Sequence, residues 1–91
     1  MNRYLCIFQG RVQGVGFRYT VIQIASRIGG LTGYVRNLST GAVEVQIQGK
    51  QEAIDEFLNE VLHSNGWIRI DDYQTKKIPV VEEESFFDVK F

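Results

Sequence analysis

The sequence predicts an α+β protein in which two helices cover one face of a mostly antiparallel sheet. Two segments, 17–28 and 51–63, carry apolar residues at the three- and four-residue spacing of an amphipathic helix. The segments around them are short apolar runs or alternate apolar and polar residues, as strands do. The chain has 91 residues, 44% of them hydrophobic, which is enough for one core but not for two. We therefore expect a single domain over residues 1–91.

The first half of the chain is predicted to form a strand, a helix and a second strand. Residues 4–9 (YLCIFQ) are an apolar, partly β-branched run typical of a buried strand. The helix over 17–28 carries its apolar stripe at Phe17, Val21, Ile24 and Ile28. Gly29-Gly30 ends this helix, residues 31–36 (LTGYVR) return to strand character, and 37–41 (NLSTG) form a turn.

Residues 42–48 show the clearest alternation in the sequence. One face of this strand is expected to cover the core with Val43, Val45 and Ile47. The other face is expected to meet water with Glu44, Gln46 and Gln48.

The rest of the chain predicts a helix and two more strands. The second helix, 51–63, is expected to end at Asn65-Gly66, and a fourth strand begins at Ile68 and runs toward Lys77. The acidic residues 82–84 are expected to lie in a solvated turn. A final strand alternates Phe87, Val89 and Phe91 with Asp88 and Lys90.

The order is therefore β-α-β-β-α-β with an added C-terminal strand. Two helices that are each apolar on one face need a single sheet face to pack against. This predicts a ferredoxin-like, open-faced α/β sandwich. The architecture hosts RNA-binding proteins, amino-acid sensors and enzymes, so it does not identify the function.

Composition excludes several classes of protein. No apolar run approaches the roughly 18 residues of a transmembrane helix, and residues 1–8 are too short and too soon interrupted to be a signal peptide. Cys6 is the only cysteine and His63 the only histidine, so an internal disulfide and a Cys/His zinc cage are both excluded. We expect a cytoplasmic protein without a bound metal.

The charges are divided unevenly along the chain. Residues 1–43 contain five arginines and no acid, whereas residues 44–91 contain eleven acids and five basic residues. This asymmetry indicates that the first half binds an anion. Nucleic-acid-binding domains are usually basic throughout, and this chain has a pI near 5.7. A small anion fits the sequence better.

Three glycines, Gly10, Gly14 and Gly16, lie within seven positions between the first strand and the first helix. Glycines allow successive backbone N–H groups to turn toward one point, and a helix N-terminus adds a partial positive charge. Such a segment can hold a phosphate or a carboxylate. It lacks the Lys-Ser/Thr of a nucleoside-triphosphate P-loop and, with Tyr19 in place of the third glycine, the dinucleotide motif. A tight connection without a ligand fits the spacing equally well.

Two polar side chains near this segment are candidates for binding. Arg18 lies in the first turn of the helix, where its charge opposes the helix dipole and no acid in 17–28 balances it. Its guanidinium could bind two phosphate oxygens while backbone amides bind the third, or it could be a solvated surface arginine. Asn37 ends the second strand, and taken alone it is more simply a turn-forming residue.

Together these residues resemble the acylphosphatase family. The resemblance is carried by residues 10–18 (GRVQGVGFR), 33–37 (GYVRN) and 41–45 (GAVEV), and chain length and element order extend it over nearly the whole sequence. The family implies a small cytoplasmic monomer that hydrolyses the carboxyl–phosphate anhydride of acyl phosphates to a carboxylate and inorganic phosphate. The resemblance also implies direct attack by water, with no cofactor, no metal and no covalent intermediate. Neither nucleic acid nor a membrane is implied as a partner.

The resemblance also implies roles for individual residues. Arg18 corresponds to the phosphate-binding arginine and Asn37 to the asparagine that orients water. The phosphoryl oxygens are then held by the backbone amides of Val12, Gln13, Gly14, Val15, Gly16 and Phe17. We also expect from the topology that the final strand brings the Phe91 carboxylate close enough to pair with Arg18.

A second class of function is a binding module, either a sensor of a small anion or an accessory domain of an enzyme that uses carbamoyl phosphate. Such a module would bind phosphate without hydrolysing its ester or anhydride. An RNA-recognition module fits less well, because the paired aromatic motifs are absent and the acidic second half would repel an RNA backbone.

Overall fold

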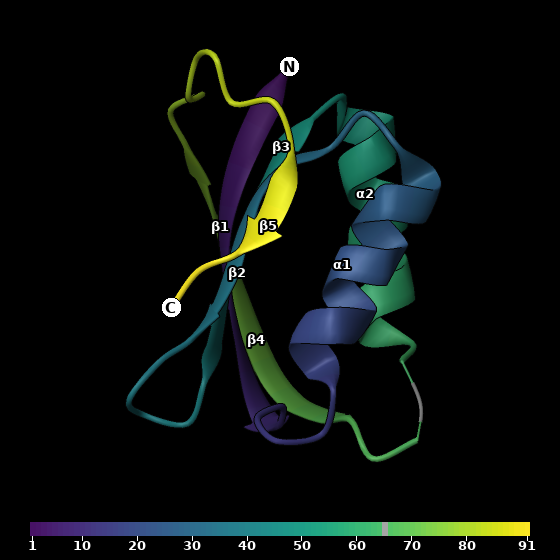
Figure 1. Ribbon diagram of the computed structural model, residues 1–91, viewed down its shortest axis with the longest axis vertical. Coiled ribbons are helices and arrows are strands. Elements are labelled where there is room, and N and C mark those ends of the chain that lie inside the picture. The colour runs from purple at the N-terminus through teal and green to yellow at the C-terminus, as the bar shows by residue number, and fades with distance from the viewer. Residues whose placement is uncertain (65) are drawn as a thin grey trace.

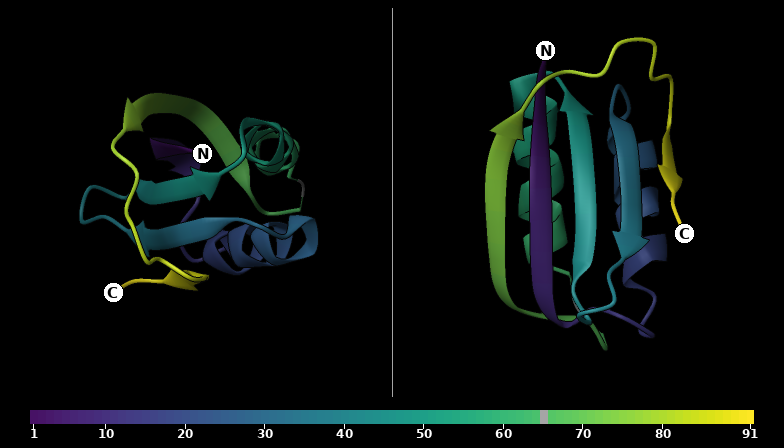
Figure 2. Two further views of the ribbon diagram at one scale, coloured as in Figure 1. Left: turned by 90° about the horizontal axis from the view of Figure 1, so that it is seen from above. Right: turned by 90° about the vertical axis from the view of Figure 1, so that its left-hand side faces the viewer.

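The computed structural model describes residues 1–64 and 66–91, and it confirms the predicted fold class (Figure 1). The elements are β1 (Asn2–Arg11), α1 (Phe17–Ile28), β2 (Thr32–Asn37), β3 (Val43–Gly49), α2 (Gln51–Leu62), β4 (Arg69–Ile78) and β5 (Phe87–Val89). The sheet order is β4-β1-β3-β2-β5, and every neighbouring pair is antiparallel except β2 and β5. Both helices lie on the same face of this sheet, behind the strands in the right-hand view of Figure 2.

The bounds of the helices follow closely from their local patterns. α1 spans Phe17–Ile28 as predicted. α2 begins at Gln51 and ends at Leu62, with His63 as its C-cap. The predicted end signal at Asn65-Gly66 includes Asn65, which lies outside the described residues.

β4 lies within one residue of its predicted extent at each end, although its residues do not alternate as those of β3 do. It runs over ten residues, Arg69–Ile78, beside β1 at one edge of the sheet. Most of its residues are exposed on both faces, so the alternation that identifies a half-buried strand is missing.

The core lies between the helices and the sheet. Its fully buried residues come from three strands and both helices, and they are Cys6, Phe8, Val21, Val35, Val43, Val45, Ile47, Ile54, Phe57 and Val61. The inward face predicted for β3 is therefore confirmed.

The opposite face of β3 was expected to meet water at Glu44, Gln46 and Gln48, and that expectation is wrong for Glu44 and Gln48, whereas Gln46 is partly exposed. Glu44 and Gln48 are 8% and 4% exposed. The segment between β4 and β5 contacts this face, where Glu84 forms an ion pair of 2.7 Å with Arg3, itself 2% exposed. The Gln48 side chain donates to the carbonyl of Val81 at 2.9 Å and accepts from its N–H at 2.8 Å. Glu84 is thus half-buried in a polar layer rather than part of a solvated turn.

Gly33 of β2 lies where a side chain would collide with the neighbouring strand β3. Its φ is +137°, and a Cβ at this position would lie 1.9 Å from the carbonyl oxygen of Gln46. Only glycine fits here. The close contact fixes the strand whose last residue is Asn37.

The final strand ends earlier than predicted. β5 stops at Val89, although the N–H of Lys90 still donates to the carbonyl of Val35 at 2.8 Å. Phe91 does not continue the alternation, since its side chain is 99% exposed.

Candidate active site

The loop between β1 and α1, residues 12–16, lies at one end of the sheet, at the bottom of Figure 1. The buried side chains of Val12 and Phe17 anchor its two ends. Gly14 and Gly16 have φ values of +74° and +80°, a left-handed conformation that glycine adopts without steric cost. In turns of this kind, consecutive N–H groups can point to one side and attract an anion.

The N-terminus of α1 adds further hydrogen-bond donors to this loop. The N-cap is Gly16, which has no side chain to cap the helix, and the first turn contains no acidic residue. The N–H of Thr20 donates to the carbonyl of Gly16 at 3.0 Å, and the N–H groups before it have no acceptor within the helix. The positive end of the helix dipole is therefore not neutralised locally.

The loop and the helix end line a pocket of about 180 Å³. Its lining residues are Val12, Gly14, Gly16, Phe17, Arg18 and Tyr19. Neither a carboxylate nor an imidazole is among them, so the charged side chain of the pocket is that of Arg18.

Arg18 and Arg11 differ from the other three arginines of the first half, because neither forms an ion pair among the described residues, and of the two only Arg18 lines this pocket. The other three pair with acids from the second half, in the ion pairs Arg3–Glu84, Arg27–Glu60 and Arg36–Glu44. In residues 1–64 and 66–91, Arg18 has no ion-pair partner within 4.0 Å. Its guanidinium carbon lies 5.6 Å from the centre of the Phe91 ring. The expected pairing with the Phe91 carboxylate is thus not observed, and the aromatic ring takes its place.

Asn37 lies at the same end of the sheet as the loop. It is the exposed last residue of β2 and pairs with Val43 across the β2–β3 turn. This turn and the loop at the start of α1 occupy the lower end of the right-hand view of Figure 2. The Gln13 side chain connects them, since its Nε2 donates to the carbonyls of Leu38 and Ala42, each at 2.8 Å.

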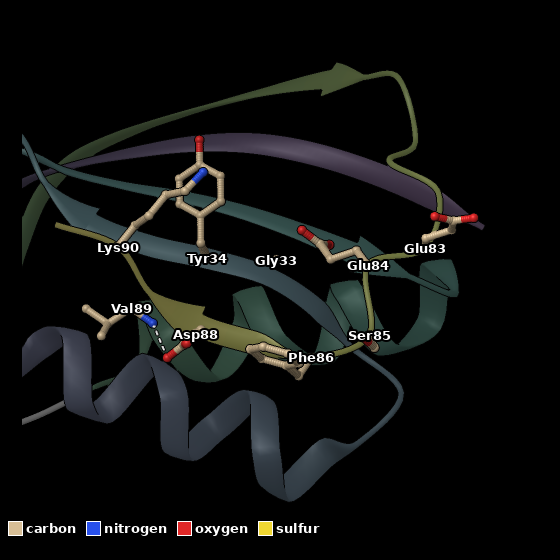
Figure 3. A pocket seen from close by; sticks show the side chains of 9 residues that line it. All are labelled: Gly33, Tyr34, Glu83, Glu84, Ser85, Phe86, Asp88, Val89 and Lys90. Carbon is tan, nitrogen blue, oxygen red and sulfur yellow. Dashed lines mark hydrogen bonds between the residues drawn. The ribbon is translucent and has the colours of Figure 1, made fainter.

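A larger pocket, of about 310 Å³, lies between β2, β5 and the segment before β5 (Figure 3). Two of its four charged side chains, Glu84 and Lys90, have partners. Glu84 pairs with Arg3, and Lys90 lies 4.2 Å from the centre of the Tyr34 ring. The Tyr34 hydroxyl donates to Glu44, and burial together with this hydrogen bond raises the pKa of Tyr34 to about 12. Three carboxylates, those of Glu83, Glu84 and Asp88, line the larger pocket against one lysine, and they would repel an anion. We therefore place the candidate site at the pocket beside α1.

Two further properties bear on the class of site. In the part of the chain that the structure describes, no three His, Cys, Asp or Glu side chains are grouped to hold a metal ion. Neither described helix has the length and apolar character that crossing a membrane requires. The pocket itself combines backbone N–H groups, a helix N-terminus and one guanidinium, which is a set of donors suited to a tetrahedral oxyanion.

Known proteins share both the sequence and the fold of this chain. The sequence profile of the family described as Acylphosphatase matches residues 4–89. A relative named "Acylphosphatase" from Clostridium beijerinckii is 40% identical over 91 residues, covering 100% of both chains. The crystal structure of acylphosphatase from Bacillus subtilis superposes with a TM-score of 0.93 at 32% identity, covering 100% of both chains. The chain belongs to the acylphosphatase family. The fold also matches part of T. kodakarensis HypF at 36% identity and a TM-score of 0.87, covering 100% of this chain and 12% of that one.

The site residues implied by the resemblance to acylphosphatases are only partly gathered in one pocket. Five of them line it, namely Val12, Gly14, Gly16, Phe17 and Arg18. Gln13, Val15 and Asn37 do not contribute to the lining. Tyr19 lines the pocket although it was not among the predicted binding residues. A signal for it existed, because Tyr19 neighbours Arg18 and falls outside the apolar stripe of α1, and it is 68% exposed.

Proposed function

We propose that this member of the acylphosphatase family hydrolyses acyl phosphates in the pocket at the N-terminus of α1. The products are a carboxylate and inorganic phosphate. The observation that carries the proposal is Arg18, an arginine without an ion-pair partner among the described residues, in the same pocket as the glycine loop and the uncapped helix end. This is the position at which a phosphoryl group gains most from a positive charge.

The phosphoryl group is bound by the loop amides and Arg18. We assign its oxygens to the backbone N–H groups of Val12, Gln13, Gly14, Val15, Gly16 and Phe17. The planar guanidinium of Arg18 donates two parallel hydrogen bonds to the same group. These donors stabilise charge on the equatorial oxygens as the bond to the leaving group breaks.

Asn37 orients the attacking water. Its side-chain amide offers one acceptor and two donor hydrogens, which suffice to hold a water molecule in line with the leaving group. Phosphoryl transfer passes through a loose transition state, so the water needs orientation more than deprotonation. A phosphoryl oxygen of the substrate accepts its proton. The leaving group is already a stable carboxylate anion, so no general acid is needed. Attack is direct, with no metal and no covalent intermediate.

We further propose that residues 1–91 act as one domain, as a monomer in the cytoplasm, with acyl phosphate and inorganic phosphate as the only ligands. The support is that all seven elements share one core and that Cys6 is a buried free thiol, as is usual in a reducing compartment. Sedimentation equilibrium of the purified protein tests the oligomeric state. A mass twice that of the chain would contradict it.

A binding module is the second candidate, and the likeness to HypF favours it. There the matching region is 12% of a much longer chain, so this fold also occurs as one part of a larger protein. A binding module would retain the phosphate contacts of the loop without turnover. Absence of hydrolysis together with measurable phosphate affinity would favour this second function.

The test is the release of phosphate from benzoyl or acetyl phosphate in the presence of a chelator. Arg18→Ala should lose both substrate binding and turnover, and Arg18→Lys should stay poor because a lysine lacks the two-pronged donor geometry. Asn37→Ala should lower kcat by about 100-fold or more, since misplacing a reacting group has effects of this size, while phosphate affinity is kept. Arg27→Ala, which removes an exposed arginine from the other end of the same helix, is the matched control and should keep wild-type turnover. Full activity in Asn37→Ala would overturn its assigned role.

A further inference from the structure

The side chain of Gln13 makes contacts that its proposed backbone role does not require. Any residue at this position offers an N–H group to a phosphate. The Gln13 side chain instead turns away from the pocket lining and donates from one nitrogen, Nε2, to the carbonyls of Leu38 and Ala42. Both distances are 2.8 Å, within the ordinary range for N–H···O hydrogen bonds.

The two acceptors lie at the two ends of the β2–β3 turn. The N–H of Leu38 donates to the carbonyl of Ala42 at 2.9 Å, and the N–H of Gly41 donates to that of Leu38 at 3.1 Å. These bonds close the turn on itself. Gln13 therefore binds a rigid unit at both ends rather than a single flexible residue.

Leu38 directly follows Asn37, so the first of these bonds holds the residue next to the proposed water-binding side chain. Asn37 itself is exposed at the end of β2. Asn37 pairs with Val43 on β3, and Val43 pairs with Phe8 on β1, so the sheet links Asn37 to the strand that precedes the loop but places no strand-pairing restraint on residues 12–16 themselves. The Gln13 amide supplies a direct restraint across 25 and 29 residues of sequence.

The chemistry of the contact requires a primary amide. Two carbonyl oxygens are satisfied by the two hydrogens of one –NH₂ group. Glutamate at this position would place a carboxylate against both carbonyls, and methionine would fill the same volume without donating. Both replacements keep the backbone N–H, so they separate the side chain's role from that of the loop amide.

We propose that Gln13 is a positioning residue, whose side chain fixes the β2–β3 turn, and with it Asn37, relative to the phosphate loop. The water held by Asn37 and the phosphoryl group held by the loop are thereby kept in line. This inference rests on the proposed function, because it assumes that Asn37 orients water and that the loop binds phosphate.

The expected signature is a loss of kcat without a loss of phosphate affinity. Displacement of a reacting group by about 1 Å costs up to about 100-fold in rate, so Gln13→Met should lower kcat by about 10- to 100-fold. Gln13→Glu should lower it at least as far, because it adds repulsion at both carbonyls. The inhibition constant of inorganic phosphate should stay within about twofold of the wild type in both variants, since the loop N–H groups and Arg18 are unchanged.

The experiment measures kcat, KM and phosphate inhibition with benzoyl phosphate for wild type, Gln13→Met, Gln13→Glu, Asn37→Ala and the double variant Gln13→Met/Asn37→Ala. If Gln13 acts through Asn37, the Gln13 substitution should cost less than about twofold once Asn37 is absent, because coupled residues are not additive. Gln48→Ala is the matched control. It removes another glutamine side chain that ties a strand to a backbone segment, at Val81, and it should lower stability while kcat of the folded fraction is unchanged.

Three results would overturn the inference: wild-type kcat in both Gln13 variants, an equal loss of kcat in the presence and absence of Asn37, or a parallel loss of phosphate affinity. These differ from a failure of the proposed function, in which the wild type would not hydrolyse benzoyl phosphate, or Arg18→Ala and Asn37→Ala would keep full activity.

Discussion

Because Arg3 and Glu84 form an ion pair in the buried polar layer over β3, we expect Glu84→Gln to destabilise the protein strongly. Arg3 is 2% exposed and Glu84 is 19% exposed, and two hydrogen bonds join them, of 2.7 and 3.2 Å. Glutamine has almost the same shape but carries no charge. The substitution therefore leaves the buried guanidinium of Arg3 without its counter-ion.

The size of the stability loss in Glu84→Gln depends on the hydrogen bonds that Arg3 retains. Breaking a buried ion pair by removing one partner typically costs about 3–5 kcal/mol. Arg3 retains hydrogen bonds to the side chains of Gln46 at 2.9 Å and Gln48 at 3.1 Å, and Glu84 is partly solvated. We therefore expect the free energy of unfolding to fall by about 2–3 kcal/mol at pH 7. This is at or below the lower end of that range, because Arg3 keeps its hydrogen bonds to the two glutamines and position 84 keeps some contact with water. For a domain of this size the melting temperature should fall by roughly 10–20 °C.

The pH dependence of this loss has a definite sign. Partial burial acts to raise the pKa of Glu84, but hydrogen bonding from Arg3 and Thr32 and the charges of Arg3 and Lys90 together outweigh it and hold that pKa below its ordinary value of 4.5. A carboxylate whose pKa is lower in the folded state stabilises the fold fully above its unfolded pKa. That contribution is lost as the pH falls through the folded pKa. The difference between wild type and Glu84→Gln should thus be largest near neutral pH and shrink in acid.

Unfolding in guanidinium chloride at pH 7 and at about pH 3 measures both the loss of stability in Glu84→Gln and its dependence on pH. Glu82→Gln makes the same charge change at an exposed neighbour and should alter stability by less than about 0.5 kcal/mol. A loss below about 0.5 kcal/mol for Glu84→Gln at pH 7 would refute the buried ion pair. An undiminished difference in acid would refute the electrostatic origin of its contribution.

Three further predictions address the fold and the site. Gly33→Ala should unfold the protein or cost more than about 3 kcal/mol of stability, since its Cβ would meet the Gln46 carbonyl at 1.9 Å. Gly41→Ala, with φ of +95° and no atom within 4 Å of the added Cβ, should cost only about 1–2 kcal/mol of backbone strain. Equal losses of stability in thermal unfolding would contradict this. Cys6 should resist alkylation at about pH 8 in the native protein and react after unfolding, because burial raises the pKa of its thiol to about 12; rapid native labelling, followed by mass spectrometry, would show that the core opens. The kcat for benzoyl phosphate should stay flat between about pH 5 and 8 and be insensitive to chelators, because the proposed chemistry uses no titrating base; a bell-shaped profile or strong inhibition by a chelator would point to a different mechanism.

Local patterns were sufficient for those parts of the fold that depend on neighbouring residues. The stripe of α1 and the glycines after it fixed both of its bounds, since helix periodicity and termination are local properties. The same holds for the inward face of β3. The pattern of β4 was weaker, because a strand exposed on both faces has no reason to alternate.

The parts that could not be predicted depend on contacts between distant residues. The polar face of β3 looks solvated in sequence, and only the contacts of Arg3 with Glu84, 81 residues away, and of Gln48 with Val81, 33 residues away, make it a buried layer. In the same way, the glycine loop and Arg18 stood out locally, whereas the connection from Gln13 to the turn after Asn37 requires the folded hairpin. The uneven charge along the chain was only a weak indicator of anion binding, because three of the five arginines in residues 1–43 pair with acids of the second half.

The central claim is that the loop before α1, together with Arg18, binds a phosphoryl group. A crystal structure of the protein soaked in inorganic phosphate tests it most directly. We predict one phosphate in the pocket lined by Gly14, Gly16 and Arg18, with its oxygens accepting from backbone N–H groups and from the guanidinium. An empty loop, with the Arg18 guanidinium turned outward and bound to another part of the protein, would contradict the account.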